Sequence, residues 1–507
     1  IDSLACLNRG GQSLLLHPSR YRLAKIARFS PIAMVILIVA GPTLSAHSAD
    51  RPNVVLILAD DLGYGDVGFN GCRDIPTPNI DSLASDGVRF ANGYSSHPFC
   101  SPMRAGLMTA KYQHRFGYVN NVAFDPHNQV MGLPTSERTI ASRLQEAGYR
   151  TGMVGKWHLG AASPFHPLRR GFEFFYGFLG GGHDYFIVDT TAQLSENYKA
   201  ALDDNGNPAT FDGYLTRVLT DQAINFLKVG DDDRPYFLYV AYNAPHGPLQ
   251  APQEAITQFS LIEDQKRRTY AAMVWVMDQQ IGRLLKTIDD IGDRNNTLVV
   301  FLSDNGGPEK ANASDNGPLR GQKGDVYEGG IHVPFVMRMP GTLPPATVYS
   351  HPVTSIDAAQ TALGLAQVPI QPNADGVNLI PFVLDQRESA PHEAIFWRTA
   401  KDSKIAVRRG NDKLVVLQGE PSLFDLASDL GESTDLASTK PTMVDEIRQL
   451  WDCWNEHNQP AIFPGYRDYH ESLVEFHQQL MQDAIAADLA RWKVRLNVSN
   501  AGSQLPK

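Results

Sequence analysis

The sequence predicts an α/β protein built on a large, mixed, mostly parallel sheet between layers of helices, with a smaller C-terminal α+β subdomain. Continuous apolar runs, such as residues 53–59, are typical of strands that are buried on both faces. Segments with helical spacing alternate with these runs along most of the chain. Beyond residue 370 short alternating strands follow instead, and a chain of 507 residues has room for an accessory unit beside its main core.

The alternation predicts the following elements in chain order. Strands are expected at residues 53–59, 151–154, 236–241, 298–302 and 332–337. Helices are expected at residues 138–147, 215–228, 270–288 and 355–365. The apolar stripe of the 270–288 helix indicates core packing rather than a binding face. In such folds ligands gather beyond the carboxyl ends of the strands, and polar residues follow several of these strands.

We divide the chain into four parts. Residues 1–49 are expected to hold a signal peptide and the residues upstream of it, and residues 50–370 to form the main α/β domain. A proline- and asparagine-rich connection leads to the α+β subdomain at 371–465, where strands are expected at 404–408 and 413–417 and a helix at 443–457. Residues 466–507 form a tail without an assigned role.

The first part has the order of a secretory signal. Basic residues at 20–28 precede an apolar run at 32–40 and small residues at 45–49, with cleavage expected near Ala46 or Ala49. The alternative, a transmembrane anchor, is disfavoured because the apolar run is short for a bilayer. We therefore expect an exported protein, periplasmic or secreted, without a stable membrane anchor.

Charge and cysteine content narrow the functions further. The formal net charge of −10 argues against nucleic-acid binding, so an anionic substrate needs a local positive pocket. After cleavage the chain would keep Cys72, Cys100 and Cys453, an odd number that leaves at least one without an intramolecular partner. Cys72 and Cys453 are expected to be free or paired with each other.

Two polar pairs end apolar strands. Asp60-Asp61 follows the strand at 53–59, and Asp304-Asn305 follows the strand at 298–302. Such residues are also common in turns. Four oxygen donors that converge from two strand ends, however, suit a hard divalent cation such as Ca²⁺.

The run Cys100–Arg104 begins a predicted helix. A side chain at the first position of a helix lies among free backbone N–H groups, and the arginine adds a positive charge beside it. Negative charge is therefore favoured near the Cβ of Cys100, and the run alone predicts an anion site.

Three further segments carry basic side chains. Strand alternation is expected to bring Lys156 and His158 to one face, where both would point at one anion. His246 follows a buried strand in a proline-flanked turn, a place where a histidine is often merely solvated. Lys323 lies in a glycine-rich segment, where the simplest alternative is a surface lysine.

The loop at 180–186 combines glycines with polar and aromatic side chains, among them His183. Such a loop could pack against a sugar, with His183 in contact with the substrate. The alternative is a structural glycine turn with a buried aromatic ring, and the sequence leaves both open.

Together these motifs resemble the formylglycine-dependent (type I) sulfatases of the alkaline phosphatase superfamily. Between residues 51 and 430 they occur in the family's order: Asp-Asp, Cys-x-Pro-x-Arg, Gly-Lys-Trp-His, Pro-His, Asp-Asn-Gly and Lys. In this family the cysteine is oxidised to an aldehyde, 3-oxoalanine or formylglycine, whose hydrate attacks the sulfur of a sulfate ester. The resemblance implies the alkaline phosphatase-like fold, a formylglycine-generating maturation enzyme as a partner, and hydrolysis of sulfate monoesters.

The resemblance also implies a metal site and a nucleophile. Ca²⁺ would be held by Asp60, Asp61, Asp304 and Asn305, with the converted Cys100 as a further ligand. Asp304 would accept the proton of the nucleophile, and Arg104 would fix the nucleophile segment.

The remaining roles concern the sulfate group. Lys156, His246 and Lys323 would cradle its oxygens, and either His246 or Lys323 would protonate the leaving alcohol. His158 would be the base that regenerates the aldehyde. The expected substrate is a sulfated saccharide, with small aryl sulfates as surrogates, whereas the sugar and the sulfate position stay open.

Two other functions stay open at this point. A phosphonate monoester or phosphodiester hydrolase of the same superfamily would share the nucleophile and the metal site. A sulfoglycan-binding protein with an unconverted Cys100 would not be an enzyme at all.

Overall fold

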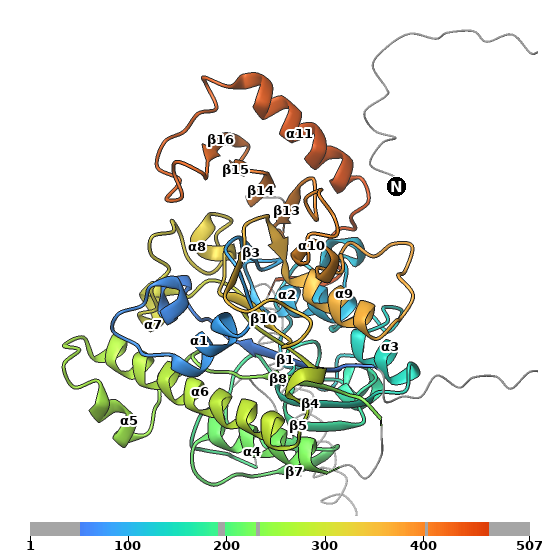
Figure 1. The fold of residues 1–507 in the computed structure, drawn as a ribbon, viewed down its shortest axis with the longest axis vertical. Helices are drawn as coiled ribbons and strands as arrows, with labels where there is room; N and C mark the ends of the chain where they lie inside the picture. The colour runs from blue at the N-terminus through green and yellow to red at the C-terminus, as the bar shows by residue number, and fades with distance from the viewer. Residues whose placement is uncertain (1–50, 191–197, 230–233, 401–403, 466–507) are drawn as a thin grey trace, which may run out of the picture. The chain divides into compact units, whose positions relative to one another are not determined.

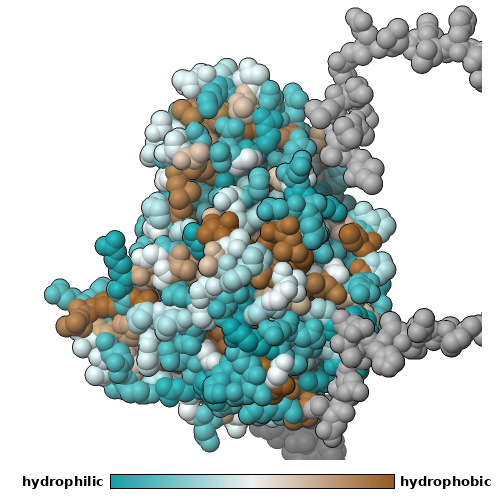
Figure 2. All heavy atoms as spheres, viewed as in Figure 1, coloured by the Kyte–Doolittle hydropathy of each residue, from teal (hydrophilic) through white to brown (hydrophobic). Residues whose placement is uncertain are grey.

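The computed structural model describes residues 51–190, 198–229, 234–400 and 404–465. The predicted signal peptide and the tail at 466–507 lie outside the described residues, so the division into four parts stays a prediction. Within the described chain no helix is long and apolar enough to cross a membrane. On the face seen in Figure 2, hydrophobic residues form separate patches among hydrophilic ones.

A ten-stranded sheet forms the centre of the molecule. Five neighbouring strands, from β9 to β5, are parallel, and the strands beyond them include antiparallel pairs. The order across the sheet is β11 (Thr347–Tyr349), β2 (Val88–Phe90), β10 (Phe335–Arg338), β9 (Thr297–Ser303), β1 (Asn53–Ala59), β8 (Tyr236–Ala241), β4 (Arg150–Lys156), β5 (Phe174–Phe178), β6 (Leu202–Asp204) and β7 (Asn207–Ala209). The predicted mixed, mostly parallel sheet is confirmed.

Strand β1 shows why the sheet is buried on both faces. Its side chains alternate, so that Val54 and Leu56 join one core cluster whereas Val55 and Ile57 join another. Both clusters are closed to solvent, which explains the continuous apolar run in the sequence.

Helices cover both faces of this sheet (Figure 1). One face is covered by α1 (Pro78–Ser85), α4 (Leu215–Lys228) and α6 (Gln265–Asp290). The other is covered by α2 (Cys100–Thr109), α3 (Ile140–Glu146) and α9 (Ser355–Leu365). Shorter helices are α5 (Gln253–Gln258), α7 (Glu309–Asn312), α8 (Glu328–Ile331) and α10 (Ile380–Val383). The predicted helices at 215–228 and 355–365 therefore have the expected bounds.

The C-terminal subdomain is a four-stranded antiparallel sheet with one long helix. Its strands are β13 (Ile395–Arg398), β14 (Lys404–Arg409), β15 (Asp412–Leu417) and β16 (Glu420–Asp425), followed by α11 (Pro441–Asn455). Val407 and Leu414 pack under α11, whereas Ala406 and Val415 on the opposite face pack against Tyr94 and residues near α8. A two-stranded sheet of β3 (Gly93–Tyr94) and β12 (Val353–Thr354) completes the fold. The predicted α+β subdomain is confirmed.

Candidate active site

The two polar pairs meet at the carboxyl ends of adjacent parallel strands. Strands β1 and β9 pair in register from Asn53 with Thr297 to Ala59 with Ser303, so the residues that follow them leave the sheet side by side. The backbone N–H of Asp61 donates to Asp304 Oδ1 at 3.2 Å, and Asn305 Nδ2 donates to Asp61 Oδ1 at 2.7 Å. The topology of the sheet thus brings together residues that are more than 240 positions apart.

The N-terminus of α2 adds Cys100 to this cluster. One ligand atom from each of Asp60, Asp61, Cys100 and Asp304 lies within 4.8 Å of the others, and all four residues are buried. Asn305 Oδ1 is buried beside them without a hydrogen-bond partner among the described residues. Three carboxylates and an unpartnered amide oxygen are the ligands that a hard cation such as Ca²⁺ prefers. The residues therefore fit the predicted metal.

Arg104 holds the cluster together from one turn further along α2. Its Nη2 lies 2.9 Å from Asp304 Oδ2 and 3.3 Å from Asp60 Oδ2, and its Nη1 donates to the carbonyl oxygen of Lys156 at 2.9 Å. The guanidinium is fully buried, so these contacts compensate a charge that water cannot reach. Arg104 thereby ties α2 to the ends of β1, β9 and β4.

Two lysines that are far apart in the sequence contact carboxylates of this cluster. Lys156, the last residue of β4, contacts Asp60 through its Nζ. Lys323 Nζ lies 2.6 Å from Asp61 Oδ1 and 3.0 Å from Cys100 Sγ. Three basic side chains, Arg104, Lys156 and Lys323, therefore lie at this point of the fold, each paired with a carboxylate of the cluster.

His158 lies beside Lys156 for a different reason from the predicted one. Strand β4 ends at Lys156, and the backbone of His158 is left-handed, with φ of 55°. Strand alternation therefore does not relate the two side chains, and that part of the prediction was wrong. His158 Nε2 lies 3.2 Å from the carbonyl oxygen of Val122, and its buried Nδ1 has no hydrogen-bond partner among the described residues.

His246 follows β8 and faces the cluster from a third side. Its Nδ1 lies 2.7 Å from the carbonyl oxygen of Gly247, which assigns the proton of the neutral ring to Nδ1. Its Nε2 lies 3.6 Å from Asp61 Oδ2 and is then the basic nitrogen. His246 is thus more than a solvated loop histidine.

Burial and charge set the protonation states of the acidic groups in the cluster. Burial, followed by the charge of the Asp60 carboxylate, raises the pKa of Asp304 to about 6. Burial also opposes ionisation of Asp60, but the charges of Lys156, His246 and Arg104 outweigh it and hold its pKa below the ordinary range. A bound divalent cation would favour the ionised form of both carboxylates.

Burial and neighbouring charges also shift the pKa values of the Cys100 thiol and of the basic side chains His158 and Lys323. Burial raises the pKa of the Cys100 thiol, and the charges of Lys156 and Lys323 offset this only in part. Burial lowers the pKa of His158 far below its ordinary value, and the charge of Lys156 adds to the effect. Against burial, the Asp61 carboxylate and its neighbours raise the pKa of Lys323. The raised pKa favours the protonated thiol of Cys100, which is a poor nucleophile.

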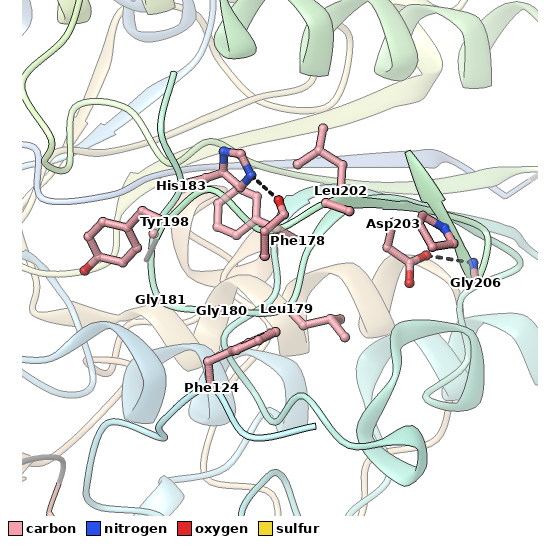
Figure 3. A pocket seen from close by; sticks show the side chains of 14 residues that line it. Phe124, Phe178, Leu179, Gly180, Gly181, His183, Tyr198, Leu202, Asp203 and Gly206 are labelled. Carbon is pink, nitrogen blue, oxygen red and sulfur yellow. Dashed lines mark hydrogen bonds between the residues drawn. The ribbon is translucent and has the colours of Figure 1, made fainter. Parts of the chain in front are cut away.

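The glycine loop at 180–182 lines a cavity of about 200 Å³ (Figure 3), and two of its lining residues, Gly181 and Tyr198, lie against His158 and His246. Phe124, Leu179 and Tyr198 contribute apolar surface to it, and His183 and Asp203 contribute polar atoms. The ring nitrogens of His183 lie 2.6 Å and 2.8 Å from the carbonyl oxygens of Asp184 and Ala200. His183 therefore lines the cavity while its ring is held by the backbone.

The loop at 180–186 combines features of both sequence interpretations. Tyr185 is fully buried, and its hydroxyl donates to the carbonyl oxygens of Asn243 and His246, as a structural turn with a buried aromatic requires. Phe124 and Tyr198 complete the cavity, and the Tyr198 ring lies edge-on to His246 at 6.2 Å between centroids. Sequence reasoning missed both rings because neither belongs to a motif.

Cys72 and Cys100 both carry free thiols, so the alternative in which Cys72 pairs with Cys453 is not realised. Cys72 Sγ lies 3.3 Å from Asp74 Oδ1 instead.

Models of protein families and curated relatives both match this protein along most of the chain. The model of the sulfatase family matches residues 52–368, and a second model, described as N-sulphoglucosamine sulphohydrolase, C-terminal, matches residues 322–453. N-acetylgalactosamine-6-sulfatase of Homo sapiens is 34% identical over 469 residues, which cover 82% of this chain and 87% of the relative. Arylsulfatase J of Mus musculus is 31% identical and covers 83% of this chain and 79% of its own length.

Among solved structures, the crystal structure of Ps i-CgsB in complex with k-i-k-neocarrahexaose is similar to this chain. It is 37% identical with a TM-score of 0.77, and the match covers 81% of this chain and 94% of that one. Since the sulfatase model matches more than half of the chain and the relatives extend over most of it, the chain belongs to the sulfatase family of the alkaline phosphatase superfamily and is a sulfuric ester hydrolase.

Proposed function

We propose that this chain hydrolyses sulfate monoesters of saccharides, with formylglycine formed from Cys100 as the nucleophile and Ca²⁺ as the metal. The observation that carries the proposal is the convergence of Asp60, Asp61, Cys100 and Asp304 at one buried point. The high pKa of the Cys100 thiol supports it further, because an unmodified cysteine in this place is not activated for attack.

Asp60, Asp61, Asp304 and Asn305 would hold the cation, together with the converted side chain at position 100. When bound, the cation supplies Lewis acidity, and the hydrated aldehyde supplies a hydroxyl whose pKa the cation lowers. Asp304 receives the proton of that hydroxyl. Arg104 keeps Asp304 and Asp60 in place through its buried contacts.

Lys156, His246 and Lys323 would cradle the sulfate oxygens. Each ammonium group contacts a carboxylate of the cluster. A bound cation would neutralise these carboxylates in place of the lysines, so both lysines could then donate hydrogen bonds to an anionic substrate. Either Lys323 or the doubly protonated form of His246 gives a proton to the leaving alcohol, because the neutral His246 ring carries its proton on Nδ1 and not on Nε2. His158 offers an unpartnered Nδ1 as proton acceptor and would be the base that restores the aldehyde at the end of the cycle.

His183 and the cavity beside it would take the sugar. The cavity combines apolar rings with few polar groups, which is typical of sites for organic ligands. The 37% identical structure holds a neocarrahexaose, and a 34% identical relative is named for N-acetylgalactosamine 6-sulfate. A screen of defined sulfated galactans and galactosamine sulfates, with an aryl sulfate as surrogate, is therefore the first test of the substrate.

The proposal includes export to the periplasm or beyond and a maturation enzyme that converts Cys100. Co-expression with a formylglycine-generating enzyme should replace the sulfur of Cys100 by an aldehyde oxygen, which mass spectrometry of the peptide around residue 100 detects directly. A fully unconverted cysteine in an active preparation would contradict the proposal.

The variant Cys100→Ala should lose turnover by about four powers of ten or more, because no other group in the cluster can form the covalent bond. Cys100→Ser should be equally inactive unless a maturation system that acts on serine is present. The measurement is kcat on an aryl sulfate. Full activity of Cys100→Ala would end the proposal, whereas a preference of the wild type for a phosphonate monoester or a phosphodiester would support the related hydrolase instead.

Removal of Ca²⁺ by a chelator should abolish turnover and lower the unfolding temperature, because three buried carboxylates then lose their cation. At a hundredfold excess over its Kd a ligand adds about 2.7 kcal/mol of stability. Added Ca²⁺ should restore both properties, and Mg²⁺ should do so less well, since it requires a tighter octahedral site. Unchanged activity and unfolding temperature after chelation would contradict the metal assignment.

A further inference from the structure

Lys323 lies on a short turn that belongs to no strand or helix. The turn runs from Gln322 to Asp325, with the N–H of Asp325 donating to the carbonyl oxygen of Gln322 at 2.9 Å. From this turn the Nζ of Lys323 contacts both Asp61 and Cys100. The position of this turn therefore sets where one positive charge of the site lies.

One side of the turn packs on the segment that precedes Cys100. The N–H of Gly324 donates to the carbonyl oxygen of Pro98 at 3.0 Å. A Cβ atom on Gly324 would lie 2.9 Å from the Phe99 ring, and the φ of Gly324 is +87°. Only glycine allows this approach, so the turn lies directly against the nucleophile segment.

Lys404 of the C-terminal subdomain holds the other side of the turn. Lys404 is the first residue of β14, and its Nζ donates to the carbonyl oxygen of Gly324 at 2.7 Å and to Asp325 Oδ1 at 2.8 Å. The second carboxylate oxygen of Asp325 accepts from the N–H of Gln322 at 3.2 Å. Lys404 therefore binds the carbonyl group of Gly324, the residue that follows Lys323, and the carboxylate that closes the turn.

We infer that Lys404 is a positioning residue for the reaction: it acts through the turn at 322–325 to place Lys323 against the sulfate group. The inference rests on the proposed function of the site. It assigns the C-terminal subdomain a part in the geometry of the active site that the sulfatase motifs, all of which lie in the main domain, do not include.

The exposure of the ion pair between Lys404 and Asp325 distinguishes a role in catalysis from a role in folding. The side chains of Lys404 and Asp325 are 36% and 33% exposed, so loss of the ion pair leaves no buried, unpaired charge. Such an exposed pair contributes little to stability. A displacement of about 1 Å at a reacting group, in contrast, can lower a rate by about a hundredfold. Loss of Lys404 should therefore affect catalysis much more than stability.

The test uses the full, converted enzyme and an aryl sulfate. Lys404→Met should lower kcat about tenfold while the unfolding temperature stays near that of the wild type, and Lys404→Arg should keep most of the activity because a guanidinium can make the same two contacts. Lys440→Met is the matched control. Lys440 belongs to the same subdomain, is 45% exposed and lies 4.0 Å from Asp412, far in sequence from the turn. It should change neither property.

A double-mutant cycle shows whether Lys404 acts through Lys323. In the background Lys323→Ala, Lys404→Met should change kcat by less than about twofold, since the side chain that it positions is gone. An effect of the same size in both backgrounds would overturn the inference, as would wild-type kcat for Lys404→Met alone. A wild type that does not hydrolyse sulfate esters would instead overturn the proposed function, and this inference with it.

Discussion

At the scale of single residues, Gly181 shows how little space surrounds His158, the proposed base. A Cβ atom on Gly181 would lie 3.0 Å from His158 Nε2 and 3.1 Å from its Cε1. The ring cannot easily move away, because its Nε2 also lies 3.2 Å from the carbonyl oxygen of Val122. The glycine loop thus keeps both the cavity and the base in their places.

Gly181→Ala should therefore lower kcat about tenfold by displacing His158, with little change in the unfolding temperature. Gly180→Ala is the matched control, because its Cβ would lie at an ordinary 3.4 Å from the Phe124 ring. It should stay within about twofold of the wild type. Equal rates for the two variants on an aryl sulfate would contradict the role given to Gly181.

At the scale of elements, Asp278 of α6 caps the N-terminus of α1. Its Oδ1 accepts from the backbone N–H groups of Asn79 and Ile80 at 3.0 Å and 2.8 Å, and its Oδ2 accepts from Asn79 Nδ2 at 2.7 Å. These bonds satisfy donors that a helix N-terminus leaves without partners. The carboxylate is completely buried, so the cap joins two helices inside the core.

Burial raises the pKa of Asp278 from 3.8 to about 6 despite these hydrogen bonds. Between the two values the folded state holds a proton that the unfolded state has lost, so the contribution of this group to stability is present below pH 4 and is lost as the pH rises through 6. Asp278→Asn does not titrate. Between pH 4.5 and 7.5 the stability of the wild type relative to this variant should therefore fall by about 2 kcal/mol.

Urea unfolding of both proteins across that pH range measures the difference. Other titrating groups cancel in the comparison, because the two chains differ at one position. A difference that does not change with pH would show that the cap stays ionised throughout.

At the scale of the whole molecule, a buried network of charges joins the C-terminal sheet to the main domain. Lys413 Nζ of β15 lies 2.8 Å from Glu328 Oε1 and 2.8 Å from Glu432 Oε1, and all three side chains are inaccessible to solvent. Tyr94 donates to Glu328 Oε2 at 2.6 Å, and His332 Nδ1 lies 2.9 Å from the same atom. Burial opposes ionisation of Glu328, but the charge of Lys413 outweighs it and lowers its pKa.

Lys413→Met should destabilise the protein by about 3–5 kcal/mol, because it leaves two buried glutamates without their common cation. The midpoint of chemical unfolding measures the loss. Lys286→Met is the control, since the Lys286 side chain is 74% exposed and its pair with Asp290 lies on the surface of α6. It should cost less than about 1 kcal/mol. Similar midpoints for both variants would mean that the network contributes nothing to the attachment of the subdomain.

The sequence by itself determined the features that rest on local patterns. Burial on both faces made β1 a continuous apolar run, and the 3.6-residue period of α4 gave its bounds to the residue. The convergence of the proposed metal ligands could be predicted for the same reason. Asp60 and Asp304 each follow an apolar strand, and parallel strands bring their carboxyl ends to one edge of a sheet.

Only the tertiary structure decided the features that depend on contacts between distant segments. His158 reaches the site through a left-handed backbone after β4 has ended, which no alternation of side chains predicts. Phe124 and Tyr198 meet at the cavity, and Lys404 reaches a turn 79 residues earlier in the chain. A local pattern indicates which face of an element is buried, whereas the packing of the whole chain determines which segment covers that face. The motifs therefore revealed the chemistry of the site, and the fold revealed which residues hold it in position.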